Sequence, residues 1–334
     1  MSGGGPNNGR DNMDDQASTA GLTEDLSRRL LAHFVAPGYS PPMLPAVAVE
    51  LHGLAHRRDT DAAQISAVLE RDPLLAARVL KISQSAAFGG AGTITSLREA
   101  VARLGMRNLS DIAWEVAFDT RVFRSVKYGA LMESIQRHST ACAHLSRLTC
   151  SVTKIASEYA FLCGLLHDVG MAAALIAFSE SQALGAPPES LLGPVLHACH
   201  AEASGTVARL WKLPEDVQTV IGRHHGGAPD EPISPLTSIL IVADGLAGEL
   251  GAGIKWFNSD LDATDPVVFD TAKQALGLDD AKMSALRTEA QKLPVFGRGT
   301  PAPATRPAPP PLARTGSASA QRPVAKSLFA TRKR

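Results

Sequence analysis

The segment AFLCGLLHDVGMAAALIAF, residues 160–178, is the most informative part of this sequence. Its residues are apolar or small except for His167 and Asp168, so the helix that it predicts is buried on most sides. Burying an ionised carboxylate costs several kcal/mol unless the group is paired, hydrogen-bonded or bound to a metal. Asp168 therefore needs compensation inside the core. An ordinary ion pair with a neighbouring Arg or His is the simplest form, and a metal ion is the alternative.

Histidines are concentrated around this segment, because seven of the ten lie between residues 138 and 225. On the predicted helix around His138, this histidine shares the apolar face with Ile135 and Cys142, so it points into the core. His144 points away from that face. His138 is therefore the better candidate ligand of the two.

The remaining histidines of this region lie on later helices. His200 precedes the small residue Ser204 by one turn, at a position suited to a close helix contact, and His197 is an alternative one turn earlier. His224 and His225 end another predicted helix, where histidines interact favourably with the helix dipole and the free carbonyls. For this pair, capping is the alternative to a functional role.

A second acid, Asp244, lies in SILIVADGLA on a core-facing stripe. Two buried acids beside several inward histidines predict one shared polar centre. Mixed imidazole and carboxylate ligands suit a divalent transition metal (Fe, Mn, Zn or Ni), with open positions for phosphate or activated water. The sequence offers no comparable support for a Ser or Cys nucleophile, and it contains no phosphate-binding glycine loop.

Composition predicts an all-α protein. The chain has 334 residues, of which 45% are hydrophobic and only 5% aromatic, and Ala and Leu are abundant. This length provides a substantial core, and the bias suits helices better than β-branched strands. We see no strand pattern and no internal repeat.

Charge is distributed unevenly although the net charge is zero. Residues 297–334 contain eight of the 33 basic residues and no acidic one, which leaves 25 basic against 33 acidic residues in the rest. A body of that sign is a poor non-specific nucleic-acid binder, so nucleic-acid binding is expected only through the basic tail.

The sequence predicts five segments. They are a disordered leader at 1–20, a helix and linker at 21–40, a main domain at 41–250, a helical extension at 251–296 and a disordered Pro/Ala-rich tail at 297–334. Within them, Asp72-Pro73 predicts a helix start, and Ser96 with Glu99 predicts a capping box that opens a helix over 97–104, which Gly105 closes. Further helices are expected at 108–118, after Pro214, after Ser234-Pro235, at 267–276 and at 280–292.

The four cysteines, Cys142, Cys150, Cys163 and Cys199, form no CxxC pair and lie in helical, largely apolar stretches. They are expected to be buried free thiols in a reducing compartment. The first twenty residues lack the apolar core of a signal peptide, and no uninterrupted apolar run is long enough to cross a bilayer. We therefore expect a cytoplasmic protein without membrane contact.

The chain resembles a known family in the order of its polar residues. His138, His167-Asp168, His200, His224-His225 and Asp244 on successive helices resemble the metal-binding pattern of the HD superfamily of phosphohydrolases. More specifically, the region from about Pro41 to Leu250 resembles the HDOD domain, the HD-related output domain of bacterial signalling proteins. The similar segments are LPAVAVEL at 44–51, DPLLAARVLKISQSAAFG at 72–89, ITSLREAVARLGMRNL at 94–109, GLLHDVG at 164–170 and HAEASGTVARLWKLPEDV at 200–217.

The resemblance implies an all-α fold with an N-terminal helical half and a C-terminal HD-like core. It implies metal ligation by His138, His167, Asp168 and Asp244, with His200, His224 and His225 as a second set for metal or phosphate. HDOD domains are regarded as regulatory modules, whereas the related HD-GYP enzymes hydrolyse cyclic di-GMP. This chain has Met171 in place of the HD-GYP lysine, Ser134 in place of an acidic residue, and no Gly-Tyr-Pro segment after His225.

Two functions follow from the resemblance. The first is a non-catalytic regulatory module that contacts signalling proteins in trans, since no receiver, cyclase or kinase segment precedes the domain. The second is a metal-dependent phosphohydrolase acting on a nucleotide or another phosphoester. The lost lysine favours the first function, because it removes a phosphate contact.

Overall fold

The computed structural model describes residues 8–44, 46–57, 59–85, 94–122, 125, 127–226, 233–256, 259–261 and 263–296. The predicted tail at 297–334 and the first seven residues of the predicted leader lie outside the described residues. The described residues form α-helices α1–α14 and one two-stranded β-pair, so the all-α prediction is confirmed. The pair joins β1 (Lys255–Trp256) to β2 (Ser259–Asp260) in antiparallel register. Two residues per strand are too few to leave a strand pattern in the sequence.

The first helix, α1 (Asn8–Val35), begins inside the segment for which the sequence predicts a flexible leader. Residues 11–20 contain neither Pro nor Gly, so no residue there interrupts the helix. Its apolar stripe ends in Leu30 and Phe34, which are buried in the same hydrophobic cluster as the helices that follow. α1 packs on α10 (Glu189–Leu210).

An N-terminal group of short helices surrounds a core formed by residues such as Leu51, Ile65 and Leu109. Local capping sets their ends. The carboxylate of Asp61 accepts hydrogen bonds from two amides of the first turn of α3, and Asp72 caps α4 directly before Pro73, as predicted. These helices are α2 (Ala46–Ala55), α3 (Ala62–Leu69), α4 (Pro73–Ser83), α5 (Leu97–Leu104) and α6 (Met106–Arg121).

The predicted capping box at Ser96 is present in modified form. The Ser96 hydroxyl accepts a hydrogen bond from the Glu99 amide at 3.2 Å, but the Glu99 carboxylate accepts from the amide of Thr95 instead of that of Ser96. The helix spans Leu97–Leu104 as predicted. Gly105 ends it with φ +75°, a backbone conformation that favours glycine.

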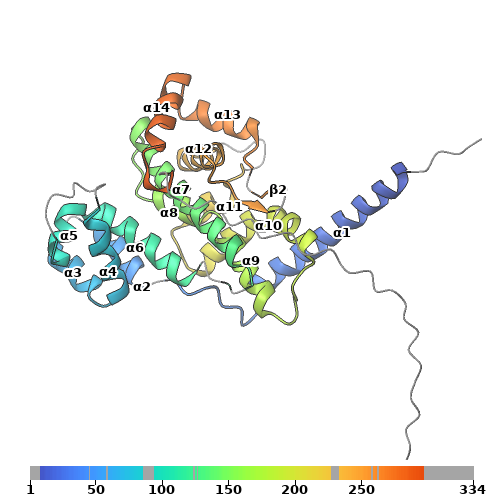
Figure 1. Cartoon of the computed structure of the whole chain (residues 1–334), viewed down its shortest axis with the longest axis horizontal. Coiled ribbons are helices and arrows are strands. Elements are labelled where there is room, and N and C mark those ends of the chain that lie inside the picture. The colour runs from blue at the N-terminus through green and yellow to red at the C-terminus, as the bar shows by residue number, and fades with distance from the viewer. Residues whose placement is uncertain are drawn as a thin grey trace, which may run out of the picture. The chain divides into compact units, whose positions relative to one another are not determined.

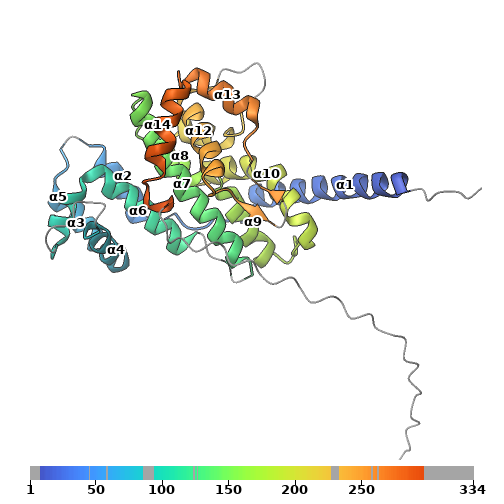
Figure 2. The same ribbon diagram turned by 45° about the horizontal axis from the view of Figure 1, so that its top comes forward.

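A second group of helices around α7 carries the histidines and acids singled out in the sequence, and Figures 1 and 2 show α7, α8 and α12 side by side. The long helix α7 packs on α8 and α12, and α9 packs on α10. The helices predicted after Pro214 and after Ser234-Pro235 are present, and so are those predicted at 267–276 and 280–292. The group comprises α7 (Gly129–Thr153), α8 (Ala160–Leu166), α9 (Val169–Glu180), α10, α11 (Glu215–Gly222), α12 (Pro235–Glu249), α13 (Pro266–Ala275), α14 (Asp280–Ala290) and the 3₁₀ turn η2 (Pro294–Phe296).

Two glycines allow these helices to approach closely. A Cβ atom at Gly164 in α8 would lie 2.5 Å from the carbonyl oxygen of Cys142 in α7. A Cβ atom at Gly170 in α9 would lie 2.4 Å from the backbone nitrogen of Ser204 in α10. Both contacts flank His167 and Asp168, so the missing side chains let α8 approach α7 and α9 approach α10 at that point.

The apolar segment at 160–178, for which the sequence predicts one helix, is divided into two helices, α8 and α9, which meet at His167 and Asp168. The stretch Ala160–Glu180 is long and apolar enough to cross a bilayer, but 94% of its 18-residue window is buried inside the fold. The polar pair at the junction and the burial identify the stretch as the core of this helical domain.

None of the four cysteines, all of which are described, forms a disulfide bond. Cys142, Cys163 and Cys199 are buried, whereas Cys150 is half-buried, so the predicted burial holds for three of them. Burial raises the pKa of the Cys199 thiol to about 11 and also raises the pKa of Cys163. Both thiols therefore remain protonated at neutral pH.

Candidate metal centre

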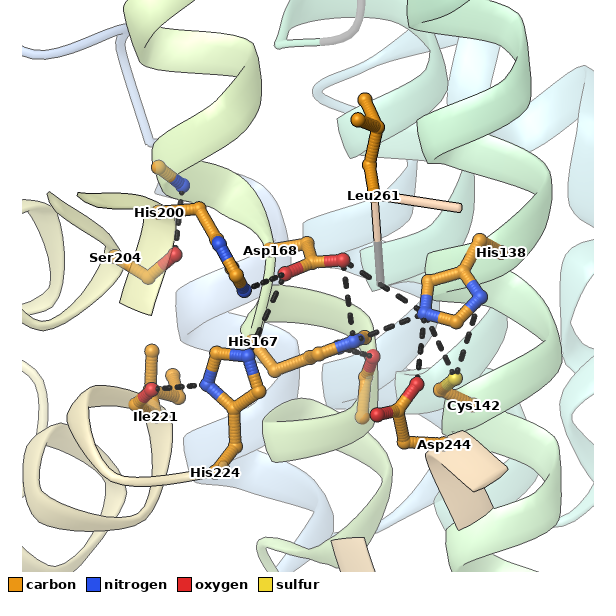
Figure 3. Close-up of polar contacts among 12 residues, drawn as sticks. His138, Cys142, His167, Asp168, His200, Ser204, Ile221, His224, Asp244 and Leu261 are labelled. Carbon is orange, nitrogen blue, oxygen red and sulfur yellow. Dashed lines mark hydrogen bonds and ion pairs between the residues drawn. The ribbon is translucent and has the colours of Figure 1, made fainter. Parts of the chain in front are cut away.

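The junction between α8 and α9 places His167 and Asp168 in one polar centre. His167 ends α8 with helical dihedral angles, and Asp168 precedes α9 with φ −103° and ψ 14°. Neighbouring side chains on a continuous α-helix point about 100° apart, since a turn contains 3.6 residues. The break in the helix lets both side chains reach the same neighbours, as Figure 3 shows.

In four histidines, a hydrogen bond from Nδ1 to a backbone carbonyl fixes the orientation of the ring. His138 donates to Ala252 at 3.1 Å, and His167 donates to Gly164 at 2.9 Å. His200 donates to Leu196 at 3.0 Å, and His224 donates to Ile221 at 2.7 Å. Because a carbonyl oxygen only accepts, Nδ1 carries the proton in each ring, and the neutral ring presents the lone pair of Nε2 to the centre.

The first half-site contains His138, His167 and Asp244. The Nε2 atoms of His138 and His167 are 3.1 Å apart, and His138 Nε2 is 3.2 Å from Oδ1 of Asp244. The other carboxylate oxygen of Asp244 accepts a hydrogen bond from the Thr264 hydroxyl at 2.8 Å. These donors come from α7, the end of α8 and α12, which are distant in the sequence.

The second half-site contains His200, His224 and His225. The Nε2 atoms of His200 and His225 are only 2.6 Å apart, and a nitrogen of each ring lies within 4.8 Å of a nitrogen of His224. His197, the alternative to His200, is exposed, and its Nδ1 is 3.2 Å from the carbonyl oxygen of Leu261. The structure therefore brings His200, and not His197, to the centre.

Asp168 lies between the two half-sites and faces both. Its Oδ2 is 3.4 Å from Nε2 of His167 and 3.7 Å from Nε2 of His138. Its Oδ1 is 3.5 Å from Nε2 of His224 and 3.6 Å from Nε2 of His200. One carboxylate thus joins two sets of imidazoles, with one oxygen for each.

Burial and charge set the protonation states of these groups. Burial lowers the pKa of His167 to about 4 and the pKa of His225 to about 3. At Asp168 burial opposes ionisation, but the electrostatic interaction with the neighbouring imidazoles of His167, His224 and His200 outweighs it and holds the carboxyl pKa below its usual range. At His224 the charge of the nearby Asp168 carboxylate overcomes burial and raises the pKa. At neutral pH the centre therefore contains ionised Asp168 and neutral His167 and His225.

The donor set fits a divalent metal ion. Both carboxylate oxygens of Asp168, Oδ1 of Asp244 and Nε2 of His224 are buried atoms without a well-formed hydrogen bond. Buried polar atoms are normally satisfied, and nearly converging lone pairs repel one another unless a cation lies between them. Deprotonated carboxylates and neutral imidazoles are also the forms that bind transition metals.

The structure gathers all seven residues that the resemblance implied. His138, His167, Asp168, His200, His224 and Asp244 are at most 2% exposed, and His225 is half-buried. The capping alternative for His224 is compatible with a role at the centre, because its Nδ1 caps the carbonyl of Ile221 while Nε2 faces Asp168.

Sequence reasoning missed two neighbours of the centre. Cys142 lies one turn after His138 on α7, with its Sγ 3.4 Å from Nε2 of His138. Thr264, which bonds Asp244, lies in the connection before α13. The shared helical face of His138 and Cys142 was the available signal for the cysteine, whereas no local pattern marks Thr264.

Comparison with known proteins adds sequence relatives and solved structures. A curated uncharacterized protein of Treponema pallidum (strain Nichols) is 30% identical over 215 residues, which are 61% of this chain and 41% of that protein. This chain thus spans about two-fifths of the length of that relative. An HDOD domain protein of unknown function from Geobacter sulfurreducens superposes with a TM-score of 0.57 at 19% identity, covering 82% of this chain and 98% of the other.

A protein from Shewanella amazonensis SB2B, named "putative metal-dependent phosphohydrolase", is similar in fold. Its TM-score is 0.55 at 17% identity, covering 85% of this chain and 95% of the other. Identities this low establish the shared fold alone. The HDOD domain family itself matches residues 42–226, more than half of the chain, and the helices observed there have the all-α arrangement of these neighbours. The chain therefore belongs to the HDOD domain family.

Proposed function

We propose that this protein is a metal-binding HDOD regulatory module that acts in the bacterial cytoplasm through contacts with signalling proteins, without catalytic turnover. The observation that carries the proposal is the combination of convergence and burial. Asp168 and the six side chains around it form a set of metal donors, yet six of these seven residues are at most 2% exposed. Such a centre is suited to hold an ion in the core rather than to admit a phosphoester.

The residues that would hold the ion are those of the two half-sites, with Asp168 between them. His138, His167 and Asp244 would serve one half, and His200, His224 and His225 the other. A bound divalent ion would neutralise the carboxylates and act as a Lewis acid on any oxygen ligand in an open position. The chain's own residues orient the donors, because the backbone carbonyls fix the imidazoles and Thr264 fixes Asp244.

The surroundings of the centre support a non-catalytic role. Met171, which stands in place of the HD-GYP lysine, is fully buried in the hydrophobic cluster, so it offers no cation to a phosphate. Ser134, which stands in place of an acidic residue, is also buried. Free cysteines are consistent with a reducing compartment.

Metal analysis tests the first part of the proposal. Protein purified without a His tag under anaerobic handling is expected to contain a transition metal, detected by inductively coupled plasma mass spectrometry. Asp168→Ala should lose metal from both half-sites because Asp168 faces both, whereas His197→Ala should retain it because His197 faces Leu261. Metal-free wild-type protein that also fails to take up Fe, Mn, Zn or Ni on addition would contradict the metal centre.

Partner capture tests the regulatory part. The full chain and a chain truncated after Phe296 would be compared as baits in bacterial extract, with mass spectrometry of the bound proteins. We expect signalling proteins to bind the full chain specifically, and binding that disappears on truncation would assign the contact to the basic tail. DNA or RNA as the sole tail-dependent partner, with steep salt dependence, would replace the protein-contact role with a nucleic-acid role.

The alternative is a metal-dependent phosphohydrolase, and one observation favours it. Asp168 presents one oxygen to each half-site, an arrangement that suits a pair of ions acting on one phosphoester. Turnover of phosphodiester or phosphomonoester substrates by the metal-loaded protein, lost in His167→Ala and Asp168→Ala but kept in His197→Ala, would establish the enzyme and overturn the non-catalytic proposal.

A further inference from the structure

Cys142 is a fully buried cysteine at the edge of the first half-site, one turn after His138 on α7. Its Sγ, a nitrogen of His138, a nitrogen of His167 and a carboxylate oxygen of Asp244 all lie within 4.8 Å of one another. Figure 3 shows the sulfur beside the His138 ring and close to Asp244. Among the described residues, it is the cysteine that lies in a group of this kind.

The three distances measured from Nε2 of His138 are close to the edges of a tetrahedral zinc site. Zinc binds imidazole nitrogen at about 2.0–2.1 Å and thiolate sulfur at about 2.3 Å, so tetrahedral geometry separates two nitrogens by about 3.3 Å and a nitrogen from a sulfur by about 3.5 Å. The two Nε2 atoms of His138 and His167 are 3.1 Å apart. Nε2 of His138 is 3.2 Å from Asp244 Oδ1 and 3.4 Å from Cys142 Sγ. The same sulfur is 3.9 Å from Nδ1 of His138, so it lies over the ring rather than along the Nε2 lone pair. All four donors lie within 4.8 Å of one another, and a rotation of the Cys142 side chain would bring them to one ion.

We propose that Cys142 binds the metal of the first half-site as a thiolate, together with His138, His167 and Asp244, and that this half-site selects zinc. The inference rests on the proposed metal centre and deepens it by adding a donor and naming the metal. On binding, the sulfur–metal bond forms as the S–H bond breaks, and the proton leaves to solvent. The thiolate and the Asp244 carboxylate together balance the charge of one divalent ion.

The two half-sites then differ in chemistry. A thiolate is a soft ligand that favours zinc over the harder manganese, whereas the second half-site offers imidazoles and one oxygen of Asp168. The other buried cysteines do not compete for this role. Cys199 donates its thiol hydrogen to the carbonyl of Val195, and it belongs to none of the groups of convergent donors.

Cobalt substitution tests the proposal directly. The full-length metal-free protein would be loaded with Co²⁺, whose complexes with thiolate show a sulfur-to-metal charge-transfer absorption in the near ultraviolet. We expect this absorption in the wild type and in Cys163→Ala, a matched control in which another fully buried cysteine is removed. Cys142→Ser and Cys142→Ala should bind Co²⁺ without it.

Affinity gives a second measurement. Competition with a chromophoric chelator should show that Cys142→Ser weakens zinc binding at the first half-site by more than about tenfold, since even residues that only support metal ligands change affinity by about that factor. Manganese binding should change much less, because its preference for sulfur is low. Circular dichroism spectra equal to those of the wild type would show that the variants fold.

X-ray absorption of the zinc-loaded wild type keeps the proposal falsifiable even where a variant fails to fold. We expect a sulfur scatterer at about 2.3 Å from zinc. Metal binding with only nitrogen and oxygen neighbours, or a charge-transfer absorption that persists in Cys142→Ala, would overturn the role of Cys142 and leave the metal centre intact. Wild-type protein that takes up neither zinc nor cobalt would instead overturn the proposed function itself.

Discussion

The backbone amide of Gly170 donates a hydrogen bond to the hydroxyl of Ser204 at 2.8 Å, which joins α9 directly to α10. Gly170 lies two residues after Asp168, and Ser204 lies one turn after His200. Asp168 and His200 face each other at the second half-site. The close approach is possible because Gly170 lacks a side chain. The packing of two helices and the geometry of the polar centre therefore depend on the same contact.

Gly170→Ala is expected to separate α9 from α10 and to destabilise the protein by about 1–3 kcal/mol or more, the usual cost of overpacking. The added Cβ would lie 2.4 Å from the Ser204 nitrogen and 2.5 Å from the His200 carbonyl oxygen, both of them backbone atoms that yield little. Urea denaturation measures the effect. The matched control is Gly248→Ala on α12, where a Cβ meets nothing within 4 Å and should stabilise the helix. Equal stability of the two variants would contradict the predicted close packing.

Thr264→Val should weaken metal binding about 10–100-fold while leaving the fold unchanged. The Thr264 hydroxyl holds Oδ2 of Asp244, and loss of a residue that orients a metal ligand has effects of that size. Chelator competition with zinc or cobalt measures the change. Thr271→Val is the control, because that hydroxyl bonds only the Val267 carbonyl on the exposed side of α13. If both variants bound metal equally, Thr264 would have no orienting role.

The lowered pKa of His52 predicts that the free energy of unfolding decreases in mild acid. Burial and the nearby His56 lower its pKa from 6.5 to about 4, so between these pH values the unfolded chain binds more protons at this site than the folded protein does. The contribution of neutral His52 is fully present above about pH 6.5 and is lost as the pH falls towards 4. His52→Gln should therefore show a shallower decline in unfolding free energy over this window than the wild type. The exposed His197→Gln should follow the wild type, and parallel curves for His52→Gln would refute the assignment.

The ion pair between Arg147 on α7 and Asp111 on α6 links the N-terminal group of helices to the second group. A guanidinium nitrogen of Arg147 lies 2.5 Å from both carboxylate oxygens of Asp111. Burial raises the pKa of Asp111 to about 7 although Arg147 opposes the shift, so the carboxylate depends on its partner.

Arg147→Met is therefore expected to destabilise the protein by about 1–3 kcal/mol, because it leaves Asp111 buried and unpaired. The double variant Arg147→Met with Asp111→Leu should recover most of the loss, since two apolar groups replace a pair without leaving an orphan. Urea denaturation of the single and double variants measures this coupling. Strictly additive losses would show that the two residues act independently.

The amino-acid sequence specified the helical class and several helix starts, because these depend on local chemistry. Asp72 before Pro73 and Ser96 three residues before Glu99 satisfy free amides within one turn, so their effect can be read from neighbouring residues. The apolar segment around His167 and Asp168 likewise determined that a compensated polar centre exists, since buried charge has the same cost in any fold.

The way in which that centre is built depends on long-range packing. Three of the carbonyls that orient its imidazoles lie three or four residues before the histidine, at Gly164, Leu196 and Ile221. The carbonyl that orients His138 belongs to Ala252, 114 residues away. The approach of Cys142 to His167 and the position of Thr264 beside Asp244 depend on how α7, α8 and α12 pack. Those distances result from long-range packing of many side chains at once, and no local stretch of sequence encodes them.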